Sequence, residues 1–408
     1  MVMFRARPTM LALLVVAAAA LAAAESPWPE VPPPPAVDAR SVAVVEFAAG
    51  EILFASDADL PIPPASLTKL MTMHLAMNAA ESGRIGLGDI VTIRREEVSP
   101  HIPFGSSLMY LEEGMRVTVD DLLRGMAVVS GNDAAFATAR IVGGDTLGFA
   151  SMMNAEASAL GLRSTRFVEP SGLSELNVTT ARDMASLARS YMRAHPYALA
   201  SYNGRYSMEF PRAEVMPPGV PPPPERIVLR NRNDLVLSYD GCDGLKTGFI
   251  VESGYNLVAT AERDGSRFIA VTLGGVQGSE ARERAGQALL DWCFDNWRTV
   301  KPRLPDIPSV RTWGGSREYV ELRPAGPAEF TVPLRYADSV TARLEAMDET
   351  DAPLAAGTRL GRIVFTSGDT VLRRIDLVAA EASPLGNIFV RIRDAVVRFF
   401  RKLFSPRG

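Results

Sequence analysis

Hydrophobic and polar positions divide the first 300 residues into strands at both ends and helices between them. Ser41–Phe47 and Glu51–Phe54 alternate on either side of Ala49-Gly50, which predicts a β-hairpin. Apolar residues then recur at helical spacing from Ser66 to Glu81, and again at 119–129, 133–142, 149–160 and 180–193. The strand pattern returns at 255–261 and 267–273, before a further helix at 280–297. This order predicts an α+β fold in which an antiparallel sheet is flanked by helices.

The pattern changes after Lys301–Asp306, a segment whose two prolines mark a domain boundary. From Val310 to about Ala382, short extended segments are separated by Gly, Pro and Asp. This pattern predicts a small all-β domain of the sandwich kind. We therefore expect a first domain at 41–300 and a β domain at 301–382.

The final segment, 383–408, predicts an amphipathic helix. Arg391, Arg398 and Lys402 fall opposite its apolar positions, and residues 389–408 carry a net charge of +5. This pattern is typical of a helix that lies in a membrane interface, and the segment is too short and too charged to span a bilayer. A helix packed on its own β domain is the alternative. The apolar positions are Phe389, Ile392, Val396, Phe399, Phe400 and Leu403.

The start of the chain has the features of an export signal. Arg5 and Arg7 precede an apolar run from Met10 to Ala24 that ends in three alanines. These features predict a secretory signal peptide at 1–24, with a retained N-terminal anchor as the alternative. A proline-rich linker at 25–40 follows, and the protein is expected to be exported.

Composition narrows the class of protein. Hydrophobic residues make up 47% and charged residues 22%, which is typical of a globular protein. A net charge of −4 and the lack of a basic face before the tail argue against a nucleic-acid partner. The three histidines have no metal-ligand spacing, so neither a metal nor a cofactor is expected. Cys242 and Cys293 could pair in an exported protein, but two separate buried thiols are the favoured interpretation.

The segment Ser66-Leu67-Thr68-Lys69 carries the first candidate chemistry. On a helix, a spacing of three puts the hydroxyl and the amine on one face. A neutral lysine can take the proton of an attacking serine hydroxyl, provided that burial or a neighbouring cation keeps the lysine unprotonated. Alone the motif is common, because a serine can also cap a helix ahead of a surface lysine.

Two further motifs follow in order. Ser130-Gly131-Asn132 lies between two predicted helices, where its hydroxyl could relay a proton and its amide could hold a substrate carbonyl. Lys246-Thr247-Gly248 opens into an extended segment, where its cation and hydroxyl suit a substrate carboxylate and its glycine permits close approach of a peptide. Each motif alone is also typical of an ordinary turn or strand. All three in this order are typical of penicillin-binding proteins and serine β-lactamases.

The residues around these motifs indicate which group of penicillin-binding proteins the chain resembles. They are Pro64-Ala65-Ser66-Leu67-Thr68-Lys69-Leu70-Met71-Thr72, Ser130-Gly131-Asn132-Asp133-Ala134-Ala135, Thr179-Thr180-Ala181-Arg182-Asp183-Met184 and Asp243-Gly244-Leu245-Lys246-Thr247-Gly248. The chain resembles the low-molecular-mass D-alanyl-D-alanine carboxypeptidases, the penicillin-binding protein 5 and 6 group, from about Ala43 to Trp297 and more faintly beyond. The resemblance implies a β-lactamase/transpeptidase-like catalytic domain, peptidoglycan stem peptides as substrates and β-lactams as covalent inhibitors. It also implies a position on the periplasmic face of the cytoplasmic membrane, held by the C-terminal helix.

The resemblance assigns a role to each residue of the three motifs. The implied roles are Ser66 as acylated nucleophile, Lys69 as its base, Ser130 as proton relay, Asn132, Lys246, Thr247 and Gly248 as substrate-binding residues, and the backbone N–H groups of Ser66 and Phe249 as oxyanion hole.

The chain departs from the family pattern at three places. Phe249-Ile250 stands where many members have His-Thr or Phe-Thr, and Pro217–Pro224 resembles an insertion. Glu169-Pro170 is superficially similar to the loop glutamate of class A β-lactamases, but the Leu-Asn that closes that motif is absent. Arg182 and Asp183 are interpreted as an ion pair or a helix cap. The alternatives are a DD-endopeptidase that cuts cross-links, a β-lactamase and a non-catalytic cell-wall-binding protein.

Overall fold

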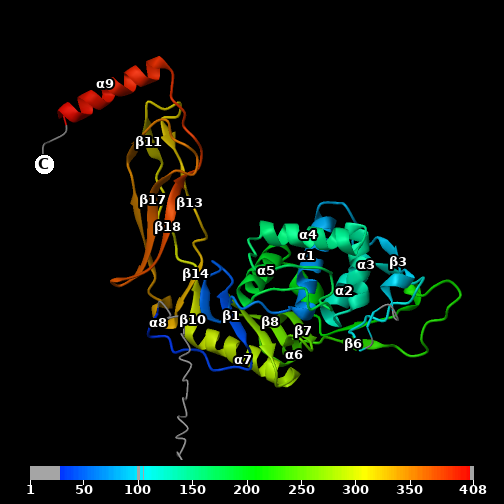
Figure 1. The fold of residues 1–408 in the computed structure, drawn as a ribbon. Coiled ribbons are helices and arrows are strands. Elements are labelled where there is room, and N and C mark those ends of the chain that lie inside the picture. Colours follow the sequence, from blue (N-terminus) through cyan, green and yellow to red (C-terminus); the bar gives the residue numbers. More distant parts are fainter. Residues whose placement is uncertain (1–27, 99–101, 104, 405–408) are drawn as a thin grey trace, which may run out of the picture.

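The computed structural model describes residues 28–98, 102–103 and 105–404 (Figure 1). The predicted signal peptide at 1–24 lies outside the described residues. An α+β domain is followed by a narrow β domain that stands on it, and the last helix lies at the far tip of that β domain (Figure 1).

A five-stranded antiparallel sheet organises the first domain, with the strand order β2-β1-β9-β8-β7. The predicted hairpin is therefore confirmed, and it pairs with the last strands of the domain. Because β7 is at the edge of the sheet, one of its sides faces the helical part of the domain instead of another strand. The strands are β1 (Ser41–Glu46), β2 (Ile52–Ser56), β7 (Cys242–Ile250), β8 (Gly254–Arg263) and β9 (Ser266–Gly275).

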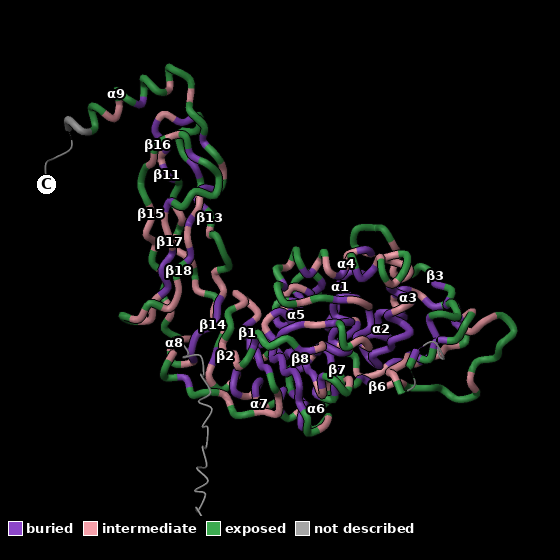
Figure 2. The backbone as a smooth tube through the Cα atoms, in the orientation of Figure 1, coloured by how far each residue is buried: buried purple, intermediate pink, exposed green. Residues whose placement is uncertain are grey.

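Both faces of this sheet are buried, as the alternation along its strands requires. On β1, Ala43 and Val45 belong to the core shared with the helical block, whereas Val42 and Val44 face the core under α7 (Ser279–Asn296). Figure 2 shows this buried interior in purple. The helical block consists of α1 (Lys69–Glu81), α2 (Val119–Val128), α3 (Asn132–Gly143), α4 (Thr146–Ala159) and α5 (Ala181–Ala194).

Short elements connect these layers. They are β3 (Ile90–Thr92) with β4 (Arg116–Thr118), β5 (Ser207–Glu209) with β6 (Val228–Arg230), α6 (Leu235–Ser238), and the single turns η2 (Arg95–Glu97), η3 (Leu199–Asn203) and η4 (Ala213–Val215). The predicted insertion Pro217–Pro224 lies in the long connection between β5 and β6, which projects beyond the helical block (Figure 1).

The prediction of one continuous helix from Ser66 to Glu81 was wrong at its start. Ser66 lies in a 3₁₀ turn, η1 (Ala65–Thr68), and the α-helix begins only at Lys69. Ala65 has a φ of +50°, a left-handed conformation that a regular first turn does not contain. Ser66 and Lys69 remain neighbours, because the 3₁₀ turn also brings residues three apart onto one side.

The β domain has its own hydrophobic core between two small sheets. The three-stranded sheet has the order β12-β11-β16 and the four-stranded sheet the order β13-β18-β17-β15. The predicted C-terminal β domain is therefore confirmed. Its strands are β11 (Val310–Trp313), β12 (Tyr319–Val320), β13 (Leu322–Pro324), β15 (Thr341–Ala346), β16 (Glu349–Asp351), β17 (Arg359–Ser367) and β18 (Thr370–Ala379).

The expected border at 300/301 falls where the two domains are joined by strand pairing. β10 (Trp297–Val300) pairs with β14 (Phe330–Pro333), and the short helix α8 (Leu334–Ala337) follows. Side chains add to this junction, since Thr331 Oγ1 donates to Glu46 Oε2 at 3.2 Å. The β domain is thus fixed to the base of the first domain.

The last helix, α9 (Ile388–Phe404), contacts the β domain through its polar side. Asp394 Oδ2 accepts a 2.7 Å hydrogen bond from Gly314 N–H, and Arg398 forms an ion pair with Asp351 while its guanidinium lies over the Trp313 ring. Most of the large apolar residues of α9 are exposed, and Figure 2 shows much of this helix in green. Its exposed residues include Ile388, Phe389, Ile392, Val396, Phe399 and Phe400. Among the described residues, no helix is long and apolar enough to cross a membrane.

Candidate active site

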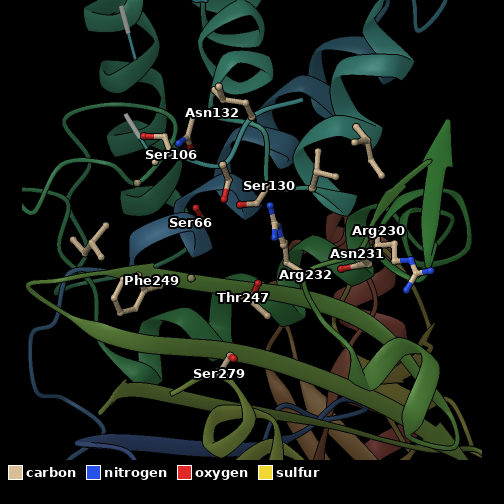
Figure 3. Close-up of a pocket in the computed structure, with 18 of the residues that line it drawn as sticks. Ser66, Ser106, Ser130, Asn132, Arg230, Asn231, Arg232, Thr247, Phe249 and Ser279 are labelled. Atoms are coloured by element: carbon tan, nitrogen blue, oxygen red, sulfur yellow. The ribbon is translucent and has the colours of Figure 1, made fainter. Parts of the chain in front are cut away.

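A cavity of about 700 Å³ lies between the edge strand β7 and the helical block. It is lined by residues from all three sequence motifs, which the fold brings together from positions far apart in the chain. Figure 3 shows Ser66 and Ser130 on one side of this space and Thr247 and Phe249 on the strand opposite. Of the eight residues assigned from the sequence, the cavity wall contains Ser66, Ser130, Asn132, Thr247, Gly248 and Phe249, whereas Lys69 and Lys246 are fully buried side chains.

Lys69 is held by three acceptors. Its Nζ atom donates to Ser66 Oγ at 3.0 Å, to Asn132 Oδ1 at 2.6 Å and to the carbonyl oxygen of Ser171 at 2.6 Å. Burial lowers the pKa of Lys69 from 10.5 to about 7, although the carboxylates of Glu169 and Asp133 act in the opposite direction. The amine is therefore neutral in a large fraction of molecules near neutral pH, and burial is the main cause.

Glycines let three segments meet at Ser66. A Cβ atom on Gly248 would lie 2.9 Å from the carbonyl oxygen of Pro64 and 3.1 Å from Ser66 N. A Cβ atom on Gly172, whose φ is +85°, would lie 1.8 Å from the carbonyl oxygen of Ala65. β7 and the segment around Gly172 thus pack directly against η1, which only glycine allows at these two positions.

Ser130 has a left-handed backbone conformation, which is uncommon for a residue other than glycine. Its φ is +64°, and its buried hydroxyl has no hydrogen-bond partner among the described residues. Asp133 supports the same loop, since its carboxylate accepts hydrogen bonds from the backbone N–H groups of Met109, Leu111 and Ala134. Burial raises the pKa of the Asp133 carboxyl, and these three N–H groups act against that rise. An unpaired buried hydroxyl beside the nucleophile is free to bond a ligand.

Lys246 contributes a second buried amine on β7. Its Nζ atom donates to the carbonyl oxygen of Thr247 at 3.0 Å. Burial lowers the pKa of Lys246 well below its ordinary value, and the positive charges of Lys69, Arg282 and Arg232 add to this effect. Such a site favours an anion, because a bound carboxylate would supply the missing opposite charge.

The cavity contains further groups that the sequence reasoning missed. Arg232 and Arg282 line it, and Arg232 points into the space between Ser130 and Thr247 (Figure 3). The ring of Phe249 is 49% exposed and lies 4.5 Å from the ring of Tyr255, centroid to centroid. Phe249 thus gives the cavity wall an aromatic surface, and Ile250, which also lines the cavity, adds an apolar side chain next to it. No local sequence pattern marks these arginines, because they come from separate elements.

The structure also shows the surroundings of the two cysteines and of Arg182 and Asp183. Cys242 and Cys293 are two free, buried thiols, and burial raises the pKa of Cys242 to about 11. Arg182 forms an ion pair with Asp59, with Nε and Oδ1 2.6 Å apart. Asp183 accepts a 2.8 Å hydrogen bond from Ser164 N–H. These contacts agree with the structural interpretation of Arg182 and Asp183.

Comparisons with known proteins match both domains. The family described as D-alanyl-D-alanine carboxypeptidase, peptidase S11, matches residues 29–277, and the penicillin-binding protein 5 C-terminal domain matches residues 306–384. The D-alanyl-D-alanine carboxypeptidase DacC of Escherichia coli is 33% identical over 378 residues, which cover 91% of this chain and 90% of that protein. DacF of Bacillus subtilis is 31% identical, with 84% of this chain and 85% of that protein covered.

A solved structure shows the same arrangement. Penicillin-binding protein 5 from Haemophilus influenzae has a TM-score of 0.74 and 31% sequence identity, over 86% of this chain and 99% of that chain. The likeness extends across most of the chain. The chain therefore belongs to the D-alanyl-D-alanine carboxypeptidase family of penicillin-binding serine peptidases.

Proposed function

We propose that the protein is a serine-type D-Ala-D-Ala carboxypeptidase that removes the terminal D-alanine from peptidoglycan pentapeptide stems through an acyl-enzyme on Ser66. One observation carries this proposal: the Nζ atom of Lys69 lies 3.0 Å from Ser66 Oγ, and burial brings the Lys69 pKa to about 7. A nucleophilic serine needs an adjacent base that is neutral near the working pH.

Acylation proceeds by proton transfer and attack. Lys69 Nζ takes the proton of Ser66 Oγ, and that oxygen bonds to the carbonyl carbon between the two D-alanines. The resulting oxyanion is stabilised by the backbone N–H groups of Ser66 and Phe249. As the peptide bond breaks, the proton that Lys69 took from Ser66 passes through the Ser130 hydroxyl to the departing amine of D-alanine, which leaves Lys69 neutral again. The oxygen of a water molecule then bonds to the carbonyl carbon as the bond from that carbon to Ser66 Oγ breaks, and the proton of the water returns to Ser66 Oγ. This step frees Ser66 and leaves the shortened peptide with a terminal carboxylate.

The substrate is held along β7. Because this strand is at the sheet edge, an extended peptide can add beside it, and Gly248 leaves room for close approach. Lys246 and Thr247 bind the terminal carboxylate, with Asn132 on the substrate carbonyl. Binding of the carboxylate raises the pKa of Lys246 again, since it offsets the surrounding positive charges.

The competing activities receive less support. A β-lactamase needs a group that activates water after acylation, and the carboxylate of Glu169 is already hydrogen-bonded to Ser171, Gly172 and Asn177. A non-catalytic binder would not need a neutral buried lysine beside the serine. A DD-endopeptidase uses the same groups, so cross-linked dimers are a second candidate substrate.

The cellular position is part of the same proposal. The protein is exported, and α9 holds it peripherally on the periplasmic face of the cytoplasmic membrane. Phe389 is 80% exposed and Phe399 62% exposed on α9. A helix with an exposed apolar side and a basic opposite side suits an anionic membrane surface. The β domain then acts as a spacer between the membrane and the active site.

Labelled penicillin tests the nucleophile. The label is expected on Ser66 alone, and Ser66→Ala is expected to lose labelling with an unchanged unfolding temperature. Digestion and mass spectrometry locate the modified residue. A label on any other serine would overturn the assignment.

A further inference from the structure

Residues of the segment 169–177 donate hydrogen bonds to the carboxylate of Glu169. Oε2 accepts hydrogen bonds from Ser171 N–H at 2.7 Å and from Ser171 Oγ at 2.5 Å. Oε1 accepts from Gly172 N–H at 2.6 Å and from Asn177 Nδ2 at 2.8 Å. Oε1 also accepts a longer hydrogen bond from Ser174 N–H at 3.4 Å. Each oxygen thus has at least two donors, which is the full capacity of a carboxylate oxygen.

The other side of this segment touches the reacting groups. The carbonyl oxygen of Ser171 accepts from Lys69 Nζ at 2.6 Å, and Gly172 packs against the backbone of Ala65 and Ser66. The neighbouring carbonyl oxygen of Pro170 accepts from Thr72 Oγ1 at 2.6 Å, one turn further along α1. The backbone that Glu169 organises is therefore the backbone that holds the base and the nucleophile.

We propose that Glu169 is a positioning residue for the acylation step, which fixes the 169–177 segment against Lys69 and Ser66 and takes no part in deacylation. This inference rests on the proposed roles of Ser66 and Lys69. A deacylating base needs an oxygen that can accept a proton from water, and both oxygens of Glu169 are occupied. Its superficial likeness to a β-lactamase glutamate is thus a likeness of sequence and not of role.

Glu169 also acts on Lys69 through its charge. Burial alone lowers the Lys69 pKa strongly, and the negative charge of Glu169 is the largest influence that raises it. A base must be neutral at the working pH and yet bind a proton firmly once it takes one from serine. The carboxylate thus keeps the Lys69 amine basic enough to accept that proton.

Two substitutions separate the charge of Glu169 from its shape. Glu169→Gln removes the charge and turns one acceptor into a donor that faces N–H groups. Glu169→Asp keeps the charge but shortens the side chain. Glu175→Gln is the matched control, since Glu175 is an exposed carboxylate in the same segment and does not line the cavity.

The experiment measures acylation by a fluorescent penicillin and release of the penicilloyl group as separate rates, from pH 5 to pH 9. Glu169→Gln is expected to slow acylation roughly tenfold or more at neutral pH and to leave release within about threefold of wild type. In a plot of acylation rate against pH, the fall of the rate on the acid side (the acid limb) is expected at lower pH for Glu169→Gln than for wild type. The reason is that loss of the negative charge lowers the Lys69 pKa. Glu169→Asp should keep the limb near its wild-type position, and Glu175→Gln should match wild type throughout.

Two results would overturn the inference. One is acylation of Glu169→Gln at the wild-type rate with an unmoved limb. The other is normal acylation with release slowed by orders of magnitude, which would make Glu169 the deacylating base. If Glu169→Gln does not fold, Ser171→Ala removes only the hydroxyl that donates to Glu169 and should slow acylation in the same direction to a smaller extent. A wild-type protein that does not acylate would instead refute the proposed function itself.

Discussion

Lys69 differs from an ordinary surface lysine because its amine is buried and hydrogen-bonded to the nucleophile. Burial penalises the charged form, so the pKa falls from 10.5 to about 7. The base form of Lys69 is the neutral amine, and its fraction rises as the pH passes upward through that value. The same residue type on the surface would be protonated and could not accept the serine proton.

This pKa predicts the pH dependence of acylation. Below pH about 7, the rate of penicillin acylation should fall about tenfold for each unit of pH, and above that pH it should level off. Stopped-flow measurement of acylation across this range checks the expectation. A rate that is flat between pH 5 and pH 8 would contradict the role of Lys69 as a base.

Lys69→Arg tests the same role without loss of positive charge. Arginine does not give up its proton in proteins, so it cannot act as the base. Acylation should fall by orders of magnitude, while the unfolding temperature shows whether the variant still folds. Acylation within about tenfold of wild type, a difference of only ~1.4 kcal/mol, would exclude Lys69 as the base.

At the scale of elements, the site depends on how closely three segments approach. The edge strand β7, the turn η1 and the segment 169–177 meet at Ser66, with Gly248 and Gly172 at the contacts. A site built from packed backbones is rigid, which keeps the nucleophile, its base and the strand for the peptide in one geometry.

Gly172→Ala tests this contact. The new Cβ would lie 1.8 Å from the carbonyl oxygen of Ala65, so η1 must move and acylation should fall by roughly two orders of magnitude. Gly161→Ala is the matched control, because Gly161 also has a positive φ, +72°, but nothing lies within 4 Å of a Cβ there. Both variants carry the same backbone strain of about 1–2 kcal/mol. Equal acylation by the two variants would show that the contact at Ser66 is not needed.

At the scale of the whole molecule, α9 lies at the tip of the β domain, far from the first domain that contains the active site (Figure 1). Asp394 and Arg398 of α9 contact the β domain, whereas large apolar residues of the same helix, such as Phe389 and Ile392, are exposed. This arrangement differs from a terminal helix whose apolar side completes the core of its own domain.

Removal of α9 should separate membrane binding from catalysis. A chain that ends at Asn387 should acylate with penicillin at the wild-type rate and stay in the supernatant with anionic vesicles. The full chain should sediment with those vesicles, less so as salt rises, because the basic side chains are screened. If both chains remain in the supernatant at low salt, α9 does not anchor the protein.

Much of this organisation could be predicted from the sequence because it depends on local patterns. The strand and helix order follows hydrophobic periodicity. Ser130-Gly131-Asn132 lies at the junction of two helices and Lys246-Thr247-Gly248 lies on a strand, as expected. The 3₁₀ turn at Ser66 could not be predicted in this way, since it results from the packing of Gly172 and Gly248 against η1. The contact of Lys69 with the Ser171 carbonyl was also missed, because any residue carries a backbone carbonyl and only tertiary structure places it.

Hydrolysis of a D-Ala-D-Ala bond through Ser66 can be followed directly in the reaction products. The purified full chain and its Ser66→Ala variant are incubated with a peptidoglycan pentapeptide, and the products are followed by mass spectrometry. The wild type should release a single alanine and leave the tetrapeptide, whereas Ser66→Ala should leave the pentapeptide intact. Release of alanine by Ser66→Ala at the wild-type rate would exclude Ser66 as the nucleophile, and an intact pentapeptide with the wild type would exclude D-Ala-D-Ala carboxypeptidase activity.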